Sequence, residues 1–270
     1  MKTIVVIPAR FASERFPGKP LKRLSVGGSQ KSLIKLSWEA ARKVKNVEEV
    51  FVATDDDRIR IEAESFGAPV VMTSKKCKNG TERCAEAIEK INIDCDIVVN
   101  FQGDAPLTPD WFVEDLLNIF KENADTEIAT PVLRLDGVSL NRLKLDRSHG
   151  LVGGTTVVFD HDFNALYFSK EIIPYIDEKR SKKSANCPIY QHVGVYAYKF
   201  ETLLNYNTLK EGNLEVLEGL EQLRFLENGC SIKCVLVDSK GRTFWELNNP
   251  EDVQRIERAI NEDMNKVENT

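Results

Sequence analysis

The sequence predicts an α/β protein with an open, mostly parallel sheet, and three observations carry this prediction. Short apolar runs, typical of buried parallel strands, occupy residues 3–7, 50–54 and 96–101. The segments between them have apolar residues three and four positions apart, which is the helical period. Strands that alternate with helices form βαβ units, in which helices cover both faces of a parallel sheet.

The individual elements follow from the same patterns in chain order. The first half carries expected helices at residues 32–45, 57–66 and 80–91, and a short strand at residues 69–72. The second half is richer in β-type segments, at residues 127–134, 155–159, 193–198 and 232–237. Leucine and glutamate recur with helical spacing over residues 214–228, and Gly229 is a favourable helix end. Pro250 is expected in the first turn of a closing helix.

These elements suggest one α/β domain over residues 1–270 that carries a smaller, mixed β-rich region at about residues 130–200. A basic loop lies within that region, at residues 179–184, and is expected to be exposed. The sequence shows no internal repeat and no low-complexity linker that would separate two domains.

The composition narrows the class of protein. A chain of 270 residues with 42% hydrophobic and 29% charged residues can bury a full core. Its formal net charge of −5 argues against a protein that coats nucleic acid, so an anion site must be a local cluster of cations. Because no leader follows Met1 and no apolar run is long enough to span a membrane, we expect a cytoplasmic protein. The six cysteines lack metal-binding spacing and are expected to be reduced thiols.

The loop after the first strand contains three cations. Open α/β sheets bind ligands outside the carboxyl ends of their strands, and this loop follows such an end. It places Arg10, Arg15 and Lys19 within ten residues, and Gly18 allows close approach of the backbone. Arginine forks and a lysine point charge suit a polyphosphate, although a solvated basic loop would have the same composition. The loop is neither a P-loop nor a GxGxxG motif, so ATPase and dehydrogenase chemistry are not favoured.

Two further loops at the same expected edge could complete such a site. Residues 79–83 begin a helix, where Gly80 and Thr81 could offer backbone N–H groups to a base or a phosphate, unless Thr81 is an ordinary N-cap. Residues 100–106 place Asp104 just past a buried strand. Mg²⁺ typically binds one or two carboxylates together with substrate phosphates, which Asp104 could supply in part. The alternative is an aspartate that only stabilises the turn.

Eight motifs in this chain resemble those of the CMP-Kdo synthetases, also called 3-deoxy-manno-octulosonate (Kdo) cytidylyltransferases. They occur in the family's order over nearly the whole chain: IPARFASERFPGKPL at residues 7–21, VATD at 52–55, GTER at 80–83, QGD at 102–104, ALYFS at 165–169, HVGVY at 192–196, LEQLR at 220–224 and PED at 250–252. The resemblance implies a Rossmann-like nucleotidyltransferase fold with a mostly parallel central sheet and a smaller β-rich dimerisation region, hence a homodimer.

The activity that the resemblance implies is transfer of CMP from CTP to an acidic sugar, with Mg²⁺ as cofactor and pyrophosphate as product. The setting would be the synthesis of bacterial surface polysaccharide, and neither nucleic acid nor a membrane would be a partner. Base preferences other than cytosine stay open, because related sugar nucleotidyltransferases share the same plan of loops.

The resemblance also implies roles for individual residues. The catalytic group would consist of Arg10, Arg15, Lys19 and Asp104. The nucleotide would be bound by Ala9, Arg10, Ser13, Lys19, Gly80, Thr81, Arg83 and Gln102. The sugar side would be lined by Gln102, Tyr190, His192, Glu218 and Gln222. The metal would be bound by Asp104 and Asn248. For His192 the alternative is a core or interface position, and for glutamates 215, 218 and 221 it is the wet face of a helix.

Several positions depart from the family's pattern. Asn248 replaces an aspartate, so metal affinity should be weaker unless Glu246 or Asp252 compensates or the metal arrives with CTP. Toward the acceptor, glutamate, lysine, arginine and lysine of the family are replaced by Ala105, Thr156, Lys170 and Gln191. Either the acceptor is another 2-keto-3-deoxy sugar acid, an amino-sugar acid or a phosphonate, or the chain has diverged around an unchanged Kdo site. A catalytically idle relative that binds nucleotide is a further alternative.

Overall fold

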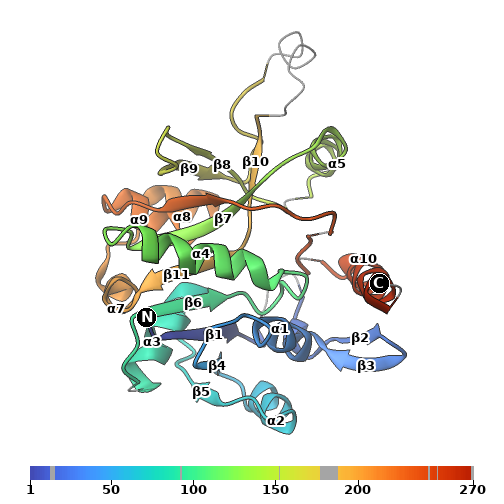
Figure 1. The fold of residues 1–270 in the computed structure, drawn as a ribbon. Coiled ribbons are helices and arrows are strands. Elements are labelled where there is room, and N and C mark those ends of the chain that lie inside the picture. The colour runs from blue at the N-terminus through green and yellow to red at the C-terminus, as the bar shows by residue number, and fades with distance from the viewer. Residues whose placement is uncertain are drawn as a thin grey trace. The chain divides into compact units, whose positions relative to one another are not determined.

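Two units make up the part of the chain that this computed structural model describes, residues 1–12, 16–91, 93–151, 153–176, 188–242, 244–247 and 249–268 (Figure 1). The first unit comprises Met1–Glu114, Ala197–Asn207 and Ser239–Thr270. The second comprises Asp115–Tyr196 and Thr208–Asp238. Each unit therefore joins segments that are far apart in the sequence. Three elements cross from one unit to the other along the chain: α4 (Asp110–Glu122), β11 (Val195–Lys199) and η2 (Asn205–Thr208).

A parallel sheet forms the centre of the first unit. Its strands are β1 (Thr3–Ala9), β4 (Glu49–Thr54), β5 (Val70–Met72) and β6 (Ile97–Phe101), and they lie in the order β5, β4, β1, β6. Each of these pairings is parallel. All residues of β1 and β6 are buried, because these apolar runs are covered on both faces. The predicted α/β class with a mostly parallel sheet is thus confirmed.

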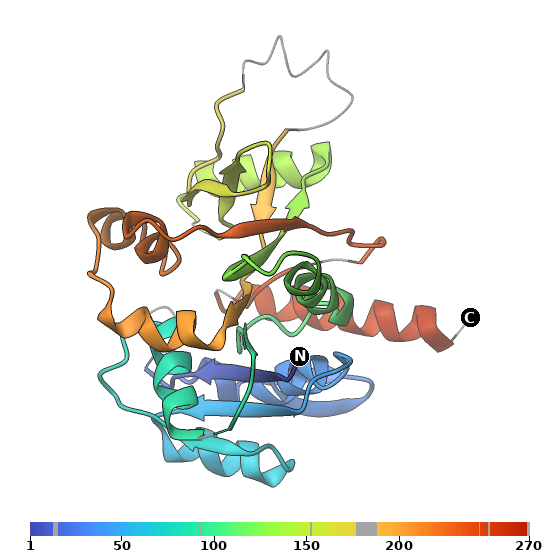
Figure 2. The same cartoon turned by 60° about the vertical axis from the view of Figure 1, so that its left-hand side comes forward.

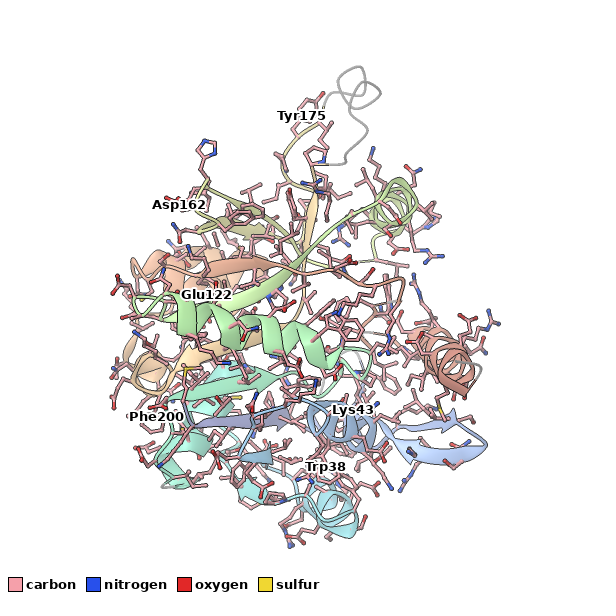
Figure 3. The ribbon with its side chains drawn as sticks, in the orientation of Figure 1. Trp38, Lys43, Glu122, Asp162, Tyr175 and Phe200 are labelled. Atoms are coloured by element: carbon pink, nitrogen blue, oxygen red, sulfur yellow. The ribbon has the colours of Figure 1, made fainter. Side chains whose placement is uncertain are left out.

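Helices cover both faces of this parallel sheet (Figure 2). Right-handed crossovers place α1 (Leu33–Ala41) and α2 (Asp57–Ser65) on one face and α3 (Gly80–Ile91) on the other. Trp38 of α1 lies toward α2 (Figure 3), and its ring centroid is 5.3 Å from that of Phe66. The chain passes from β1 to β4 and β5 and then returns to β6 on the opposite side of β1. The loops after β1 and β6 therefore flank a topological switch point, where such sheets bind ligands.

A hairpin and the closing helix complete the first unit, together with η1 (Lys19–Leu21) and α7 (Phe200–Leu204). The hairpin consists of β2 (Arg23–Val26) and β3 (Ser29–Ser32), and α10 (Asp252–Glu268) packs against β2. Backbone N–H groups of the hairpin donate to side chains of α10, from Ser25 to Glu257 and from Gly27 to Asn261. An apolar cluster lies beneath, made up of Leu24, Val26, Leu33, Leu36, Leu107, Leu247, Ile256 and Ala259.

The second unit contains a mixed sheet. Strand β7 (Ile128–Arg134) pairs antiparallel with β10 (Tyr190–His192) and parallel with β12 (Lys233–Leu236). Antiparallel pairs continue from β10 to β8 (Thr156–Phe159) and on to β9 (Ala165–Ser169). Among the residues that the structure describes, the helices that lie wholly within this unit are α5 (Gly137–Ser148), α8 (Asn213–Glu218) and α9 (Leu223–Glu227). The boundaries and the dimerisation role expected for residues 130–200 stay predictions.

Two helix predictions are wrong in detail. The single helix expected over residues 214–228 is interrupted, because Gly219 adopts a left-handed conformation, φ 59° and ψ 42°, and ends α8. Pro250 lies in the turn before α10, which begins at Asp252, and not in the helix's first turn. The hairpin, α4 and α5 have no counterpart among the sequence predictions.

Other predictions concern features that the fold now locates in part. The described cysteines are free thiols, as expected from their spacing: Cys77, Cys84, Cys95, Cys230 and Cys234. Cys187 and the basic loop at residues 179–184 lie outside the described residues. Among the helices that the structure describes, none has the length and apolar character needed to cross a membrane.

Candidate functional site

The loops after β1 and β6 meet at the switch point of the first unit. Gly18 adopts φ 70° and donates its N–H to the Phe11 carbonyl at 2.9 Å, which turns the first loop back on itself. The turn leads directly into η1, whose first residue is Lys19. Across the switch point, Gly103 lies in the loop after β6. Its backbone is so close to Pro8 that a Cβ on residue 103 would lie 2.9 Å from the Pro8 carbonyl oxygen. A glycine at position 103 therefore allows the two loops to come together.

An ion pair between these loops is the centre of the site. Lys19 Nζ lies 2.5 Å from Asp104 Oδ2 and donates a second hydrogen bond, of 3.1 Å, to the Leu247 carbonyl. The Leu247 N–H in turn donates to the Asp104 carbonyl at 2.9 Å. The Lys19 side chain is only 14% exposed and that of Asp104 is 25% exposed. One ammonium thus occupies a pocket of carboxylate and carbonyl oxygens that still opens to solvent.

Arg10 lies at the edge of this region, immediately after β1. Its side chain is exposed, and Nη1 donates to the Lys78 carbonyl at 3.3 Å, in the loop before α3. Ala9 is the last residue of β1 and is buried, so it can offer a ligand only its backbone. Ser13 and Arg15, both predicted to contact the nucleotide, lie outside the described residues.

Thr81 is not the N-cap of α3, so this alternative is wrong. The N-cap is Asn79, whose Oδ1 accepts the Glu82 N–H at 2.8 Å, while Glu82 Oε2 accepts the Lys78 N–H at 2.7 Å. These reciprocal bonds resemble a capping box. Thr81 is instead buried, and its hydroxyl lies 3.4 Å from Asn100 Nδ2.

Gly80 and Gln102 lie against each other at this helix start. A Cβ on Gly80 would come within 3.1 Å of the Gln102 amide nitrogen, so the glycine lets that amide approach the first turn of α3. Gln102 Nε2 donates to Asn100 Oδ1 at 3.3 Å. The structure thus brings two predicted nucleotide contacts, Gly80 and Gln102, beside each other.

Arg83 points into the interior of the first unit. It is 2% exposed, its Nη1 donates to Thr73 Oγ1 at 2.6 Å, and its Nη2 lies 3.5 Å from Asp55 Oδ2. The guanidinium therefore neutralises a carboxylate at the end of β4. A direct contact between Arg83 and the nucleotide stays a prediction.

The oxygen atoms around Lys19 Nζ are of the kind that bind Mg²⁺ together with substrate phosphates. Asp104 offers a carboxylate and Leu247 a carbonyl, both hard oxygen ligands. Among the described residues, no group of three or more histidine, cysteine, aspartate or glutamate side chains could hold a metal by itself. Asn248, the predicted second ligand, lies outside the described residues.

In the second unit, Glu218 is a residue predicted for the sugar side whose carboxylate accepts several hydrogen bonds. Its carboxylate accepts hydrogen bonds from Ser169 Oγ at 2.7 Å, the Lys170 N–H at 2.9 Å and Tyr167 Oη at 3.2 Å. Burial opposes ionisation of Glu218, but these donors outweigh it and lower the pKa of the carboxyl below its ordinary value. Glu218 therefore fastens α8 to the end of β9 as a carboxylate.

His192 is buried and uncharged. Its Nε2 lies 2.9 Å from Thr130 Oγ1, and that hydroxyl lies 2.7 Å from the Val195 carbonyl, to which it donates. The hydroxyl must then accept from an Nε2–H, which assigns the tautomer. Burial lowers the pKa of His192 to about 3. The geometry agrees with the core alternative, and a contact with substrate stays a prediction.

Gln222 and Tyr190 complete the predicted sugar-side group. Gln222 is 3% exposed, and its Nε2 has no hydrogen-bond partner among the described residues. An unpaired buried donor costs about 1–3 kcal/mol, so a ligand acceptor there would be favourable. Tyr190 is half-buried, and its hydroxyl accepts from Arg134 Nη2 at 2.8 Å.

The wet-face alternative is wrong for Glu215. This residue is buried and forms two hydrogen bonds of 2.7 Å with the guanidinium of Arg224 on α9. The break at Gly219 allows this pairing, because α8 and α9 can then fold against each other.

Three kinds of polar group have no counterpart among the sequence predictions: the N-cap pair of α3, a backbone carbonyl and a hydroxyl. Asn79 and Glu82 have the spacing of a capping box, which could have identified the N-cap. The carbonyl of Leu247 had no such signal, because a backbone oxygen is independent of residue type. The same holds for the Ser169 hydroxyl, whose partner Glu218 is 49 residues away.

Comparisons with known proteins show which proteins this chain is similar to. A model of the cytidylyltransferase family matches residues 4–233. Over 260 residues the chain is 42% identical to the 3-deoxy-manno-octulosonate cytidylyltransferase of Maricaulis maris (strain MCS10), covering 96% of this chain and 97% of that protein. It is 37% identical over 262 residues to the 8-amino-3,8-dideoxy-manno-octulosonate cytidylyltransferase of Shewanella sp. (strain W3-18-1), covering 96% and 99% of the two chains.

A solved structure extends the comparison to three dimensions. The CMP:2-keto-3-deoxy-manno-octonic acid synthetase in complex with CTP superposes with a TM-score of 0.80 at 32% sequence identity. The superposition covers 97% of this chain and 100% of that one. The match of fold, of sequence over nearly the full length and of the family model leads to one conclusion: the chain belongs to the cytidylyltransferase family.

Proposed function

We propose that this chain transfers CMP from CTP to a sugar acid of the 3-deoxy-manno-octulosonate type and releases pyrophosphate. The observation that carries the proposal is the pair of Lys19 and Asp104 at the switch point of a parallel sheet, with Arg10 at its edge. The relatives from Maricaulis maris and Shewanella support it, because their names state this activity and their similarity extends over almost their whole length.

The chemistry requires little covalent participation by the protein. A hydroxyl group of the acceptor gives up its proton to solvent as its oxygen attacks the α-phosphorus of CTP in line, and the bond from this phosphorus to the bridging oxygen of pyrophosphate breaks. Negative charge spreads over the phosphate oxygens during this step. Lys19 and Arg10 would bind these oxygens and hold them in position, so catalysis is mainly orientation and electrostatic stabilisation.

Asp104 and the Leu247 carbonyl would hold Mg²⁺ together with the phosphates of CTP. When bound, the ion would neutralise phosphate charge. In the structure the ammonium of Lys19 lies on both of these oxygens, so Lys19 would turn from them to the phosphates as the nucleotide binds. This exchange would keep Asp104 neutralised in either state.

The acceptor is the finer part of the proposal. The curated relatives act by name on Kdo or on its 8-amino analogue, and both are sugar acids with the same 2-keto-3-deoxy carboxylate end. Gln102 and the group of Tyr190, His192, Glu218 and Gln222 stay the predicted acceptor contacts. A homodimer and a cytoplasmic location are further expectations, of which light scattering would test the first.

The experiment that tests this function is pyrophosphate release from CTP and Mg²⁺ with a panel of acceptors. The panel contains Kdo, 8-amino-3,8-dideoxy-manno-octulosonate, a nonulosonic acid and a simple phosphonate, and products are identified by mass. We expect a CMP ester of Kdo or of its 8-amino analogue. The same assay with UTP, ATP and GTP measures the preference for cytosine. Tight binding of CTP without pyrophosphate release for any acceptor would contradict the proposal and favour a nucleotide-binding relative without activity.

A further inference from the structure

One carboxylate spans the segment that leads into α10. Trp245 Nε1 donates to Asp252 Oδ1 at 2.8 Å, and the backbone N–H of Asn249 donates to Asp252 Oδ2 at 2.7 Å. Each oxygen of Asp252 thus accepts a hydrogen bond from a different part of the segment. The guanidinium of Arg255, one turn further along α10, lies 3.4 Å from the centre of the Trp245 ring. Trp245 is therefore fixed at its ring face and at its N–H.

The residue enclosed by these contacts is Leu247. Its side chain is fully buried in the apolar cluster that joins α10 to the hairpin, and Trp245 packs against the same cluster. Its carbonyl accepts from Lys19 Nζ at 3.1 Å and its N–H donates to the Asp104 carbonyl at 2.9 Å. The position of the Leu247 backbone consequently sets the position of two groups at the centre of the site.

We infer that Trp245 and Asp252 are positioning residues for the oxygen pocket formed by Asp104 and Leu247, and that this holds the pocket in shape for a divalent cation bound with CTP. This inference rests on the proposed function. It assigns Asp252 the role of holding the segment through hydrogen bonds to both of its oxygens, which differs from the role of a substitute metal carboxylate. The Leu247 carbonyl would contact the ion, whereas Asp252 would hold the Leu247 segment in position without touching the ion.

Changing Trp245 or Asp252 should therefore lower the affinity of the site for the metal. Residues that orient ligands from behind typically change metal affinity by about 10–100-fold when they are removed. Trp245→Phe deletes the N–H donor and keeps a smaller aromatic ring for the apolar cluster and for Arg255. Asp252→Asn keeps one acceptor and loses the other. Both variants should bind the metal more weakly while the nucleotide contacts of Arg10 and Lys19 remain in the chain.

The experiment measures Mn²⁺ bound to the full chain in the presence of CTP, from the electron paramagnetic resonance signal of free Mn²⁺. It is paired with the Mg²⁺ concentration that gives half-maximal pyrophosphate release. The matched control is Glu251→Gln, which removes the same charge from the neighbouring, exposed side chain. We expect the Mn²⁺ dissociation constant to rise about 10-fold in Trp245→Phe and in Asp252→Asn, and to stay at the wild-type value in Glu251→Gln.

The double variant separates a shared contact from two independent ones. Because Trp245 and Asp252 act through the same hydrogen bond, the double variant should lose little more affinity than the weaker-binding single variant. Wild-type Mn²⁺ affinity in both single variants would overturn the inference, also where thermal unfolding shows that they are less stable. If the wild-type chain bound CTP but released no pyrophosphate with any acceptor, the proposed function would fail, whereas the Mn²⁺ measurement would still decide the role of Trp245 and Asp252.

Discussion

The two units hold their candidate functional groups in opposite ways. In the first unit, Lys19 and Asp104 neutralise each other across two loops and stay partly exposed, so each can exchange its partner for a ligand. In the second unit, Glu218 and His192 are tied to neighbouring strands by hydrogen bonds that also hold the fold together. The same kind of substitution should therefore reduce mainly activity in the first unit, but both stability and activity in the second.

The largest expected effect tests the first half of this comparison. Lys19→Met removes the ammonium that the proposal assigns to the CTP phosphates, so kcat should fall by about 10²–10³-fold, as for other groups that stabilise charge in a transition state. The free energy of unfolding should change by only about 1 kcal/mol, because the pair is not fully buried. Enzyme assays and chemical denaturation measure the two quantities.

Lys22→Met is the matched control, because Lys22 is an exposed lysine three residues further along. It should leave both quantities near the wild-type values. A kcat of Lys19→Met equal to that of the wild type would remove Lys19 from the catalytic group and with it the contrast between the units.

A smaller effect, but on stability, is expected from Glu218→Gln. The amide offers one acceptor and adds a donor, so at least one of the three donors from Tyr167, Ser169 and Lys170 loses its partner. The free energy of unfolding should fall by about 1–3 kcal/mol, the cost of an unsatisfied buried donor. Urea denaturation measures it.

Glu122→Gln is the control for this substitution. Glu122 is exposed at the end of α4 (Figure 3), so the change there should be within about 0.5 kcal/mol. If Glu218→Gln were equally neutral for stability but reduced activity, Glu218 would be a ligand-facing group like Lys19, and the contrast between the units would weaken.

The fold of the first unit could be predicted because its pattern is local. Apolar strands, helical spacing and the order of elements fix a parallel sheet, and the switch point then follows from topology. Lys19 and Asp104 could be brought together for the same reason, since both follow strands that flank this point. The spacing of Asn79 and Glu82 also predicts the N-cap of α3, because it is the spacing of a capping box.

The remaining features depend on contacts that leave no local trace. The Leu247 carbonyl has no residue signature, and Trp245 could not be linked to Asp252 from spacing alone. The helix over residues 214–228 is predicted as continuous because its leucine and glutamate pattern persists through Gly219, although that glycine ends α8 in a left-handed conformation. The alternative of a wet helix face for Glu215 rests on the same pattern, although Arg224 pairs with Glu215 in the interior.

The smallest expected effect concerns pH and sharpens the contrast at His192. Its pKa is lowered by burial from the ordinary 6.5 to about 3 in the folded chain. As the pH falls below 6.5, the unfolded chain therefore gains a proton at His192 that the folded chain does not, and stability is lost until the pH reaches about 3. The contribution is complete above 6.5, and its slope below is at most about 1.4 kcal/mol per pH unit.

Comparison with His192→Gln isolates this contribution, because the amide nitrogen of glutamine can replace Nε2–H as a donor to Thr130. Between pH 7 and pH 5 the wild type should lose about 2 kcal/mol more unfolding free energy than His192→Gln, measured by urea denaturation at each pH. His161→Gln, at an exposed histidine, should follow the wild type. If wild type and His192→Gln lost stability in parallel, His192 would accept a proton in the folded chain. The second unit would then hold a positive charge at His192 that could bind an acidic sugar. A cation that is available to a ligand would no longer distinguish the first unit from the second.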